Sequence, residues 1–281
     1  MTDALNIDLH THSEWSDGAL KPAQLIARAK LAGVDRLALT DHDTVDGLES
    51  ARAATAQMGM DLICGVEISA LWRAQTIHVL GLWIDPASPQ LRANLAAQTT
   101  RRQDRMRRMC ERLTKLGLPG RDLLRKVESQ PGVPTRTHLA AALVELGAAA
   151  TQADAFRRYL AQGKAAYRSA EWPPLIEVLE WIRRAGGRAC LAHPMRYRVS
   201  SGARRQLVSD FAHGGGAALE VVSGNNASHY IETCAELAVK FNLTGSVGSD
   251  FHDPKLAWNP LGRLAKLPDC VAPVWRERLT T

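Results

Sequence analysis

The sequence predicts a parallel α/β fold whose sheet closes into a barrel. Two observations carry this prediction. Short apolar runs alternate with helical stretches along most of the chain, the pattern of strand-helix-strand units with right-handed crossovers. Most of these runs are continuously apolar, as expected of strands that a parallel sheet buries on both faces. Because six or seven such units follow one another, a barrel is favoured over an open sheet.

Each element has its own local signal. The first strand alternates its faces, so that its polar side chains share one side. The later strands are short apolar runs, and the helices carry apolar residues at three- and four-residue spacings. In chain order, strands are expected at residues 7–12, 34–40, 62–66, 76–82, 188–192, 218–222 and 244–248. Helices are expected between them at residues 22–32, 45–58, 175–185, 203–213 and 231–241.

A helical insertion interrupts this alternation of strands and helices between about residues 91 and 168, where Leu, Met and Ala recur at helical spacing. We expect three parts: a first part of the barrel over residues 1–92, a helical cap over 93–168, and a second part of the barrel over 169–281. Residues 91–130 contain eleven Lys or Arg and four Asp or Glu, a surplus of +7 in a chain of net charge +6. Two interpretations stay open: a solvated helix face, or an electropositive rim that attracts nucleotides or RNA.

Four short motifs bring histidines and carboxylates together near the ends of predicted strands. The motif D-L-H-T-H at residues 8–12 leads into S-D-G at 16–18, and the others lie at 40–43, 66–69 and 248–252. Imidazole and carboxylate together suit Mn, Fe and Zn, and they are the ligands of multi-metal phosphoesterases. Active-site residues of such barrels gather at the carboxyl ends of the strands. The sequence therefore predicts a polynuclear metal site.

The individual ligands follow from their positions. His10 and His12 lie on one face of a strand and can meet one metal, whereas Asp17 follows in a glycine turn and can reach another. Incidental polar residues on a solvent-facing strand are the alternative for the first motif. His78 stands alone in an apolar strand, where a histidine is usually a satisfied core residue. The candidate ligands are His10, His12, Asp17, His42, Glu67, His78, His193, Asp250 and His252.

Composition sets looser limits. A chain of 281 residues can bury one barrel core, or a barrel with an inserted subdomain. No signal-peptide pattern and no apolar run near the roughly 18 residues of a membrane span is apparent. The five cysteines are scattered and lack C-x-x-C spacing, as free thiols in a reducing compartment do. We therefore expect a cytoplasmic protein with no membrane contact and no obligate protein partner.

From residue 7 to about 275, the chain resembles the PHP (polymerase and histidinol phosphatase) family of metal-dependent phosphoesterases, relatives of the amidohydrolases. The motifs H-x-H, S-D-G, T-D-H-D, a glutamate strand, H-P and D-x-H occur in the family's order. Local motifs at residues 136–138, 159–164, 193–197 and 220–224 resemble the branch of 3′,5′-nucleoside bisphosphate phosphatases and 5′-to-3′ exoribonucleases. The resemblance implies a distorted seven-stranded (β/α) barrel of the amidohydrolase-like type with up to three metals.

The resemblance also implies how the ligands are shared. It assigns His10, His12, Glu67 and Asp250 to a first ion, Glu67, His78 and His193 to a second, and Asp17, His42 and His252 to a third. Two or three divalent ions are expected, with Mn²⁺ first and Fe²⁺ or Zn²⁺ as alternatives. Glu67, His193 and Asp250 are the expected catalytic residues. A hydroxide between the two ions that share Glu67 would attack phosphorus.

A second phosphate on the substrate would need a fixed cationic pocket. The candidates are Arg136, His138, Lys164 and Arg196, because guanidinium in particular binds phosphate oxygens in pairs. Each alone is as readily explained by a structural ion pair. Ser223 and Gly224, at a strand end, could offer a hydroxyl and an amide to the nucleotide.

The predicted function is removal of the 3′-phosphate from nucleoside 3′,5′-bisphosphates such as pAp. A 5′-to-3′ exoribonuclease acting on short 5′-phosphorylated RNA is the main alternative. A small-molecule monophosphatase such as histidinol phosphatase is another. A catalytically silent nucleic-acid-binding domain is disfavoured, because all nine ligand positions are filled.

Overall fold

A computed structural model describes residues 5–256 and 261–276, so the predicted outer limits of the barrel, residues 1 and 281, lie outside it. Its seven-stranded sheet has the strands in chain order. They are β1 (Ile7–Thr11), β2 (Arg36–Leu39), β3 (Asp61–Trp72), β4 (Gln75–Leu82), β5 (Arg188–Leu191), β6 (Ala218–Ser223) and β7 (Thr244–Gly248). The edges meet where the Asp250 amide donates to the His10 carbonyl (2.8 Å) and the His12 amide to the Phe251 carbonyl (2.9 Å). The predicted α/β barrel is thus confirmed and is nearly closed.

The expectation of a wholly parallel sheet is wrong. Strand β4 runs antiparallel to both β3 and β5, whereas the other neighbouring strands are parallel. Only Arg73 and Ala74 separate β3 from β4, too few for a crossover, and Arg73 adopts a left-handed φ of 53° in the turn. Because β4 is reversed, its first half lies at the end of the barrel where the parallel strands finish. This places His78 at that end although it lies early in its strand.

Strand β3 is also longer than predicted. Residues 61–64 pair with β2, and residues 65–72 continue beyond the end of β2 as one arm of the hairpin with β4. Glu67 therefore lies in the middle of a strand rather than just past one. It nevertheless lies at the carboxyl end of β2, where it bridges to His42.

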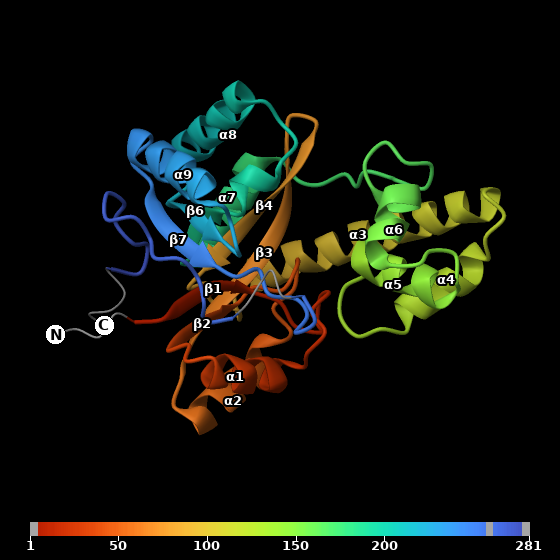
Figure 1. The fold of residues 1–281 in the computed structure, drawn as a ribbon, viewed down its shortest axis with the longest axis horizontal. Coiled ribbons are helices and arrows are strands. Elements are labelled where there is room, and N and C mark those ends of the chain that lie inside the picture. The colour runs from red at the N-terminus through yellow and green to blue at the C-terminus, as the bar shows by residue number, and fades with distance from the viewer. Residues whose placement is uncertain (1–4, 257–260, 277–281) are drawn as a thin grey trace.

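Helices cover the outside of the barrel, α1 and α2 beside the first strands and α7 to α9 beside the last (Figure 1). Each begins and ends within three residues of its predicted limits: α1 (Pro22–Leu31), α2 (Leu48–Met58), α7 (Leu175–Arg184), α8 (Ser201–His213) and α9 (Ser228–Lys240). Their apolar faces join the strands in one core, in which Leu25, Leu37 and Ile68 have no exposed surface. No helix in the described ranges combines the length and the apolar character that a bilayer span requires.

The insertion packs around a second core. It contains α3 (Pro89–Lys115), α4 (Gly120–Glu128), α5 (Arg136–Glu145), α6 (Gln152–Ala155) and a π-helical turn, η1 (Phe156–Leu160). The first turns of α3 contribute Leu91 and Leu95 to the barrel core, whereas its later turns contribute Met109 and Leu113 to the core of the insertion. Figure 1 shows the other insertion helices gathered around the far part of α3, to one side of the barrel. The division at residues 92/93 and 168/169 stays a prediction, since α3 runs through the first of these limits.

Candidate metal centre

The predicted ligands converge at the carboxyl end of the barrel around Glu67. This carboxylate has no exposed surface, and five imidazoles lie close to its two oxygens. The nitrogen–oxygen distances are 3.5 Å for His10, 3.4 Å for His12, 2.7 Å for His42, 2.9 Å for His78 and 3.0 Å for His193. Glu67 is therefore the residue through which the separate motifs meet.

Two further carboxylates complete the cluster. An oxygen of Asp250 lies 3.1 Å from the Nε2 atom of His12 and 3.3 Å from that of His10. An oxygen of Asp17 lies 3.3 Å from the Nε2 atom of His252 and 3.7 Å from that of His42. All nine predicted ligands thus lie in one contiguous cluster.

Three groups in this cluster have the composition and spacing of metal sites, with ligand atoms within 4.8 Å of one another. They are His12, Asp17, His42 and His252; His10, His12 and Glu67; and His42, Glu67 and His78. The groups follow the predicted division only in part: His12 and His42 are each shared by two groups, and Asp250 and His193 belong to none of the three. Several ligand-type atoms are buried without a hydrogen-bond partner, among them Asp17 Oδ1 and Glu67 Oε2. Buried polar atoms normally have partners, so the donor set and its geometry fit divalent cations.

The carboxylates are held ionised. Burial opposes the charged form of Glu67, but His42, His78 and His10 outweigh it and keep the pKa of Glu67 well below its usual value. The pKa values of Asp17 and Asp250 are likewise well below normal, because nearby histidines overcome the effect of burial. The cluster therefore carries three negative charges.

The histidines divide into two classes. Burial lowers the pKa of His12 to about 3 and that of His78 to about 4, so both are neutral near pH 7. Burial acts on His252 too, but Asp17 and Asp250 more than offset it and raise its pKa to about 10. Neighbouring carboxylates raise the pKa values of His10 and His42 in the same way. The raised pKa values of His10, His42 and His252 and the depressed pKa values of the carboxylates favour ion pairs in the metal-free cluster, in positions where cations would compete with the protons.

Comparison with known proteins shows the family. The PHP domain matches residues 8–115. A 5′-3′ exoribonuclease of Haemophilus influenzae is 41% identical over 270 residues, covering 96% of this chain and 98% of its own. A 3′,5′-nucleoside bisphosphate phosphatase of Chromobacterium violaceum is 41% identical over 273 residues, covering 97% and 96%. The structure of an amidohydrolase from Chromobacterium violaceum, with bound sulfate and no metal, superposes with a TM-score of 0.91 at 40% identity and covers 98% of this chain and 96% of its own.

This chain belongs to the PHP family. It is accordingly a hydrolase of the metal-dependent phosphoesterase class. The resemblance inferred from the motif order is thereby confirmed, including its branch of nucleotide phosphatases and exoribonucleases.

Two predicted ligands of the PHP barrel have unusual backbones. His193 has φ 29° and Asp250 has φ 53°, in the region that residues with a Cβ seldom adopt. Such conformations persist where the surroundings determine them, and they concentrate at functional sites. Here backbone hydrogen bonds hold the two conformations. The Asp250 amide donates to the carbonyl of His10 (2.8 Å), and the His193 amide donates to Glu220 (2.6 Å).

The sequence analysis missed the residues that orient the cluster. Glu220 is one of them: its Oε1 lies 2.8 Å from the Nδ1 atom of His10, and its Oε2 accepts the amide hydrogen of His193. Tyr197 is another, since its hydroxyl accepts from the His78 amide (2.8 Å) and donates to the Ala192 carbonyl (3.0 Å). A signal for Glu220 was present, because a lone carboxylate in an apolar strand needs a buried partner. The motif around it was interpreted only as a mark of the branch.

The turn that carries Asp17 is fixed by Asp41. The Asp41 carboxylate accepts hydrogen bonds from the amide (2.7 Å) and hydroxyl (2.6 Å) of Ser13 and from the hydroxyl of Ser16 (2.6 Å). Gly18 closes the turn, where a Cβ would come within 2.4 Å of the His12 carbonyl oxygen. The S-D-G motif therefore depends on the following T-D-H-D motif.

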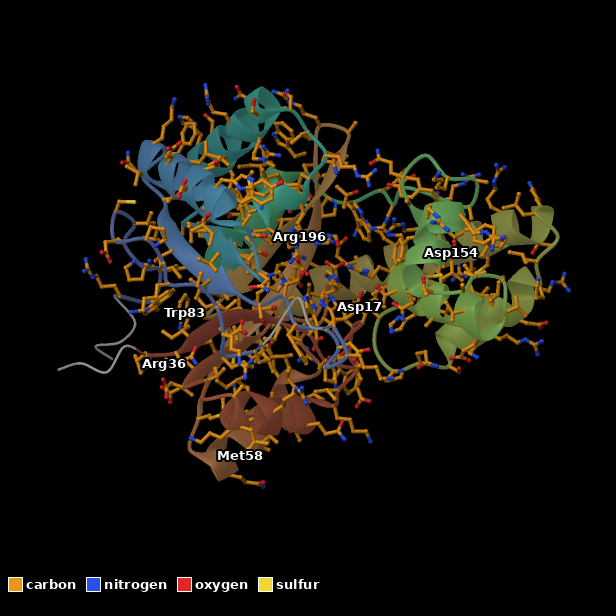
Figure 2. The ribbon with its side chains drawn as sticks, viewed as in Figure 1. Asp17, Arg36, Met58, Trp83, Asp154 and Arg196 are labelled. Carbon is orange, nitrogen blue, oxygen red and sulfur yellow. The ribbon has the colours of Figure 1, made fainter. Side chains whose placement is uncertain are left out.

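The insertion touches this end of the barrel directly. Thr137, at the start of α5, donates its hydroxyl to Asp17 (2.8 Å). The amide of Val133 donates to the carbonyl of Trp15 (3.0 Å). Arg102 of α3 forms a buried ion pair with Asp43 (2.7 Å), next to His42 in sequence. Figure 2 shows Asp17 on the side of the barrel that faces the insertion.

Two of the predicted substrate residues have structural contacts, and a third is exposed. The ring nitrogen Nδ1 of His138 accepts from the Thr135 amide (3.2 Å), which caps α5. Arg196 donates to Asp250, which is itself one of the predicted metal ligands. Lys164 is exposed in the turn after η1.

At the end of β6, the Ser223 hydroxyl is buried and has no hydrogen-bond partner among the described residues, whereas the Gly224 amide donates to the Gly248 carbonyl (2.8 Å). The amide of Gly224 is thus engaged within the barrel. Binding of substrate by Ser223, Gly224 and the four cationic candidates stays a prediction.

Arg136 differs from the other candidates. Its guanidinium carbon lies 5.6 Å from the ring centre of Phe156 and 6.0 Å from that of Tyr167, and within the described ranges it has no hydrogen bond or ion pair. Burial lowers its pKa. Among the described residues, the guanidinium of Arg136 thus has aromatic neighbours but no ion-pair partner, and its binding of an anion stays a prediction.

Arg105, which is not among the residues predicted from the sequence, lies near the same aromatic ring, Tyr167, as Arg136 does. It stacks over Tyr167 (5.7 Å) and Trp172 (5.9 Å) and gives one N–H to the Arg168 carbonyl (2.8 Å). Burial, then the charges of Arg136 and Arg102, lower its pKa to about 9. Nothing in the sequence separates Arg105 from the other arginines of α3, because its partners come from a distant segment.

Proposed function

We propose that this protein removes the 3′-phosphate of nucleoside 3′,5′-bisphosphates such as pAp, giving AMP and phosphate. The observation that carries the proposal is a pair of cationic side chains close to the metal cluster. Arg105 and Arg136 both lie near the ring of Tyr167, and Thr137, next to Arg136 in α5, contacts Asp17 of the cluster. A substrate with two phosphates matches a site with two cationic centres.

The reacting phosphate belongs at the histidine–carboxylate cluster. We assign His10, His12, Glu67 and Asp250 to a first ion, Glu67, His78 and His193 to a second, and Asp17, His42 and His252 to a third. Mn²⁺ is the expected ion, with Fe²⁺ or Zn²⁺ as alternatives. When bound, such ions activate water for attack on phosphorus and neutralise the charge that develops on the phosphoryl oxygens.

Within this proposal the chain's own residues set the geometry. Glu67 contacts ligands from four separate segments, so it fixes the spacing between the first two sites. Arg196 donates to Asp250 and holds that carboxylate toward His10 and His12. Glu67, His193 and Asp250 are the catalytic residues because they reach the centre of the cluster, where the phosphate reacts.

The 5′-phosphate belongs in the pocket of Arg105 and Arg136. Guanidinium groups bind phosphate oxygens in pairs, and an anion there would relieve the repulsion between these two partly buried cations. Tyr167 and Trp172 flank the guanidinium of Arg105 and limit its movement. Anchoring one phosphate uses binding energy to position the other for reaction.

The same arrangement supports a second activity, 5′-to-3′ exoribonucleolysis. An RNA whose terminal 5′-phosphate occupied the arginine pocket would present its first 3′ linkage to the cluster and lose one mononucleotide at a time. The relative from Haemophilus influenzae, named a 5′-3′ exoribonuclease, matches along nearly its whole length. A monophosphatase for compounds such as histidinol phosphate is less well supported, since its substrate would leave the arginines without an anion.

A phosphate-release assay separates these functions. The protein, supplied with Mn²⁺, would be given pAp, 3′-AMP, 5′-AMP, histidinol phosphate and a short 5′-phosphorylated RNA. We expect pAp to have the highest kcat/KM for phosphate release, with 5′-AMP as the product. Mononucleotide release from the RNA would add the second activity. Equal kcat/KM for pAp and 3′-AMP would contradict the anchor, and preference for histidinol phosphate would contradict the nucleotide assignment.

A further inference from the structure

We propose that Glu220 is a positioning residue that prepares one ligand for each of the two ion sites sharing Glu67. The inference rests on the proposed metal ligation, but not on the identity of the substrate. Glu220 lies in β6 and has no exposed surface. A buried carboxylate is costly unless its oxygens find donors. Its neighbours therefore indicate what it is for.

Both oxygens of Glu220 contact predicted ligands. Oε1 lies 2.8 Å from Nδ1 of His10, and Oε2 accepts the backbone hydrogen of His193 at 2.6 Å. Gly248 leaves room for this arrangement, because a Cβ there would come within 2.5 Å of Oε1. One side chain thus links β1 to the segment after β5, and it reaches one residue from each of the two predicted sites.

The bond to His10 selects the ring nitrogen that faces the metal. An ionised carboxylate can only accept, so Nδ1 of His10 must carry the hydrogen. Nε2 is then the nitrogen left to bind a cation, and it points at Glu67 (3.5 Å) and Asp250 (3.3 Å). A carboxylate that binds the far nitrogen of a ligating histidine fixes the tautomer and orientation of the ring.

The bond to His193 acts on the backbone. His193 adopts φ 29°, which is unfavourable for a residue with a Cβ, and the short hydrogen bond to Glu220 holds it there. This conformation directs Nε2 of His193 to within 3.0 Å of Glu67. Without the carboxylate, the amide would lose its acceptor and the imidazole would lose its fixed direction.

A glutamine at this position tests both bonds with almost no change in shape. Its amide has one accepting oxygen and one donating nitrogen, so it cannot accept from His10 and His193 together. If the glutamine oxygen accepts from the His193 amide, the glutamine nitrogen faces Nδ1 of His10. That favours the His10 tautomer with hydrogen on Nε2, which can then no longer bind a metal. If the oxygen instead accepts from His10, the His193 amide faces the glutamine nitrogen, which is also a donor, and loses its hydrogen bond.

The experiment measures Mn²⁺ binding to metal-free protein by calorimetry, for wild type, Glu220→Gln and Asp210→Asn. Asp210 is a matched control, a carboxylate bonded to Trp72 and Gln206 away from the cluster. We expect wild type and D210N to bind alike and E220Q to bind at least one ion about 10- to 100-fold more weakly. Nitrogen-15 spectra of the Zn²⁺-loaded protein, in which His10 has lost its second proton, should show hydrogen on Nδ1 of His10 in wild type and its loss or exchange in E220Q.

Equal affinities and unchanged His10 signals in E220Q would overturn the inference. Fewer than two ions on the wild-type protein would instead overturn the metal assignment on which it rests, so the two failures are distinguishable. If circular dichroism shows that E220Q does not fold, Glu220→Asp replaces it. This variant keeps the charge but is too short to reach both partners, so one ion should again bind more weakly, and wild-type affinity would overturn the inference.

Discussion

The barrel and the insertion use charged residues in opposite ways. At the carboxyl end of the barrel, buried carboxylates with depressed pKa values lie among histidines whose pKa values they raise. On the outer surface of the insertion, exposed arginines form ion pairs with acids one helical turn away, as Arg107 does with Asp104 and Arg125 with Asp122. Such exposed pairs contribute little to stability.

The arginines of the insertion that face the barrel differ from both groups. Arg105 and Arg136 are withdrawn from water against aromatic rings and have no carboxylate partner in the described ranges. This difference indicates that the barrel and the insertion have separate roles. The barrel would hold the metals and the reacting phosphate, whereas the inner face of the insertion would select what accompanies that phosphate.

The largest effect is expected from the centre of the barrel. Glu67→Ala removes the carboxylate that contacts five histidines, so we expect kcat to fall by about 10³-fold or more and the Mn²⁺ content per chain to fall with it. Metal analysis and phosphate release measure the two effects. Glu180→Ala on the surface of α7 is the control and should change neither. Wild-type kcat in E67A would refute the placement of the reaction at the cluster.

Proton release should follow metal binding to the barrel. The pKa values of His10, His42 and His252 are raised in the metal-free protein, so these rings hold their protons more tightly and must lose them to ligate. Glu67, Asp17 and Asp250, whose pKa values are depressed, are already ionised and release none. Mn²⁺ affinity should therefore rise with pH, with up to about three protons released in all.

Calorimetry in buffers of different ionisation enthalpy counts those protons. Each one released would change the affinity about tenfold per pH unit, so the dependence should be steep between pH 6 and 9. Affinity that does not change with pH would mean that the three rings are neutral before metal binds.

Smaller effects are expected from the insertion. Arg136→Ala and Arg105→Ala should each lower kcat/KM for pAp by about 10- to 150-fold, the loss of a charge-assisted contact of about 1.5–3 kcal/mol. Because 3′-AMP has no 5′-phosphate, its kcat/KM should hardly change, and Mn²⁺ content should be that of wild type. Arg125→Ala, on the outer surface, is the matched control. Parallel losses with both substrates would assign the two arginines to folding rather than to the anchor.

The sequence predicted the barrel better than the insertion, for a physical reason. Metal-ligating residues need a definite chemistry at the end of a strand, so motifs such as T-D-H-D identified the cluster before its geometry was known. The reversal of β4 was missed, because a buried antiparallel strand has the same apolar composition as a parallel one. Glu220 and Tyr197 were missed because orientation of a ligand depends on contacts between strands that are distant in sequence.

The arginines proposed to hold the 5′-phosphate show the same limit of prediction from sequence. Arg105 and Arg125 look alike in sequence, both lying in basic helices of the insertion. They differ in the structure only because Tyr167 and Trp172, far along the chain, cover one and leave the other in water. Composition therefore shows that the insertion is basic, but it could not tell which of its charges are available to an anion, and its role as a cap stays a prediction.

The smallest effect concerns capture of the substrate, and it separates the two faces of the insertion. Steering by charge weakens as salt shortens the Debye length to about 10 Å at 0.1 M and about 8 Å at 0.15 M. Outer arginines such as Arg107 and Arg125 lie beside acids that offset their charge, so we expect kcat/KM for pAp to fall only a few-fold between low and physiological salt, while kcat stays nearly constant.

Most of that salt dependence should disappear in Arg136→Ala, because the field that reaches the substrate comes from the inner face. It should persist in Arg125→Ala. If it persists in R136A and disappears in R125A, the outer surface captures the substrate, and the contrast between the two faces is wrong. Equal falls of kcat and kcat/KM in wild type would mean that salt acts on the reacting centre in the barrel rather than on capture by the insertion.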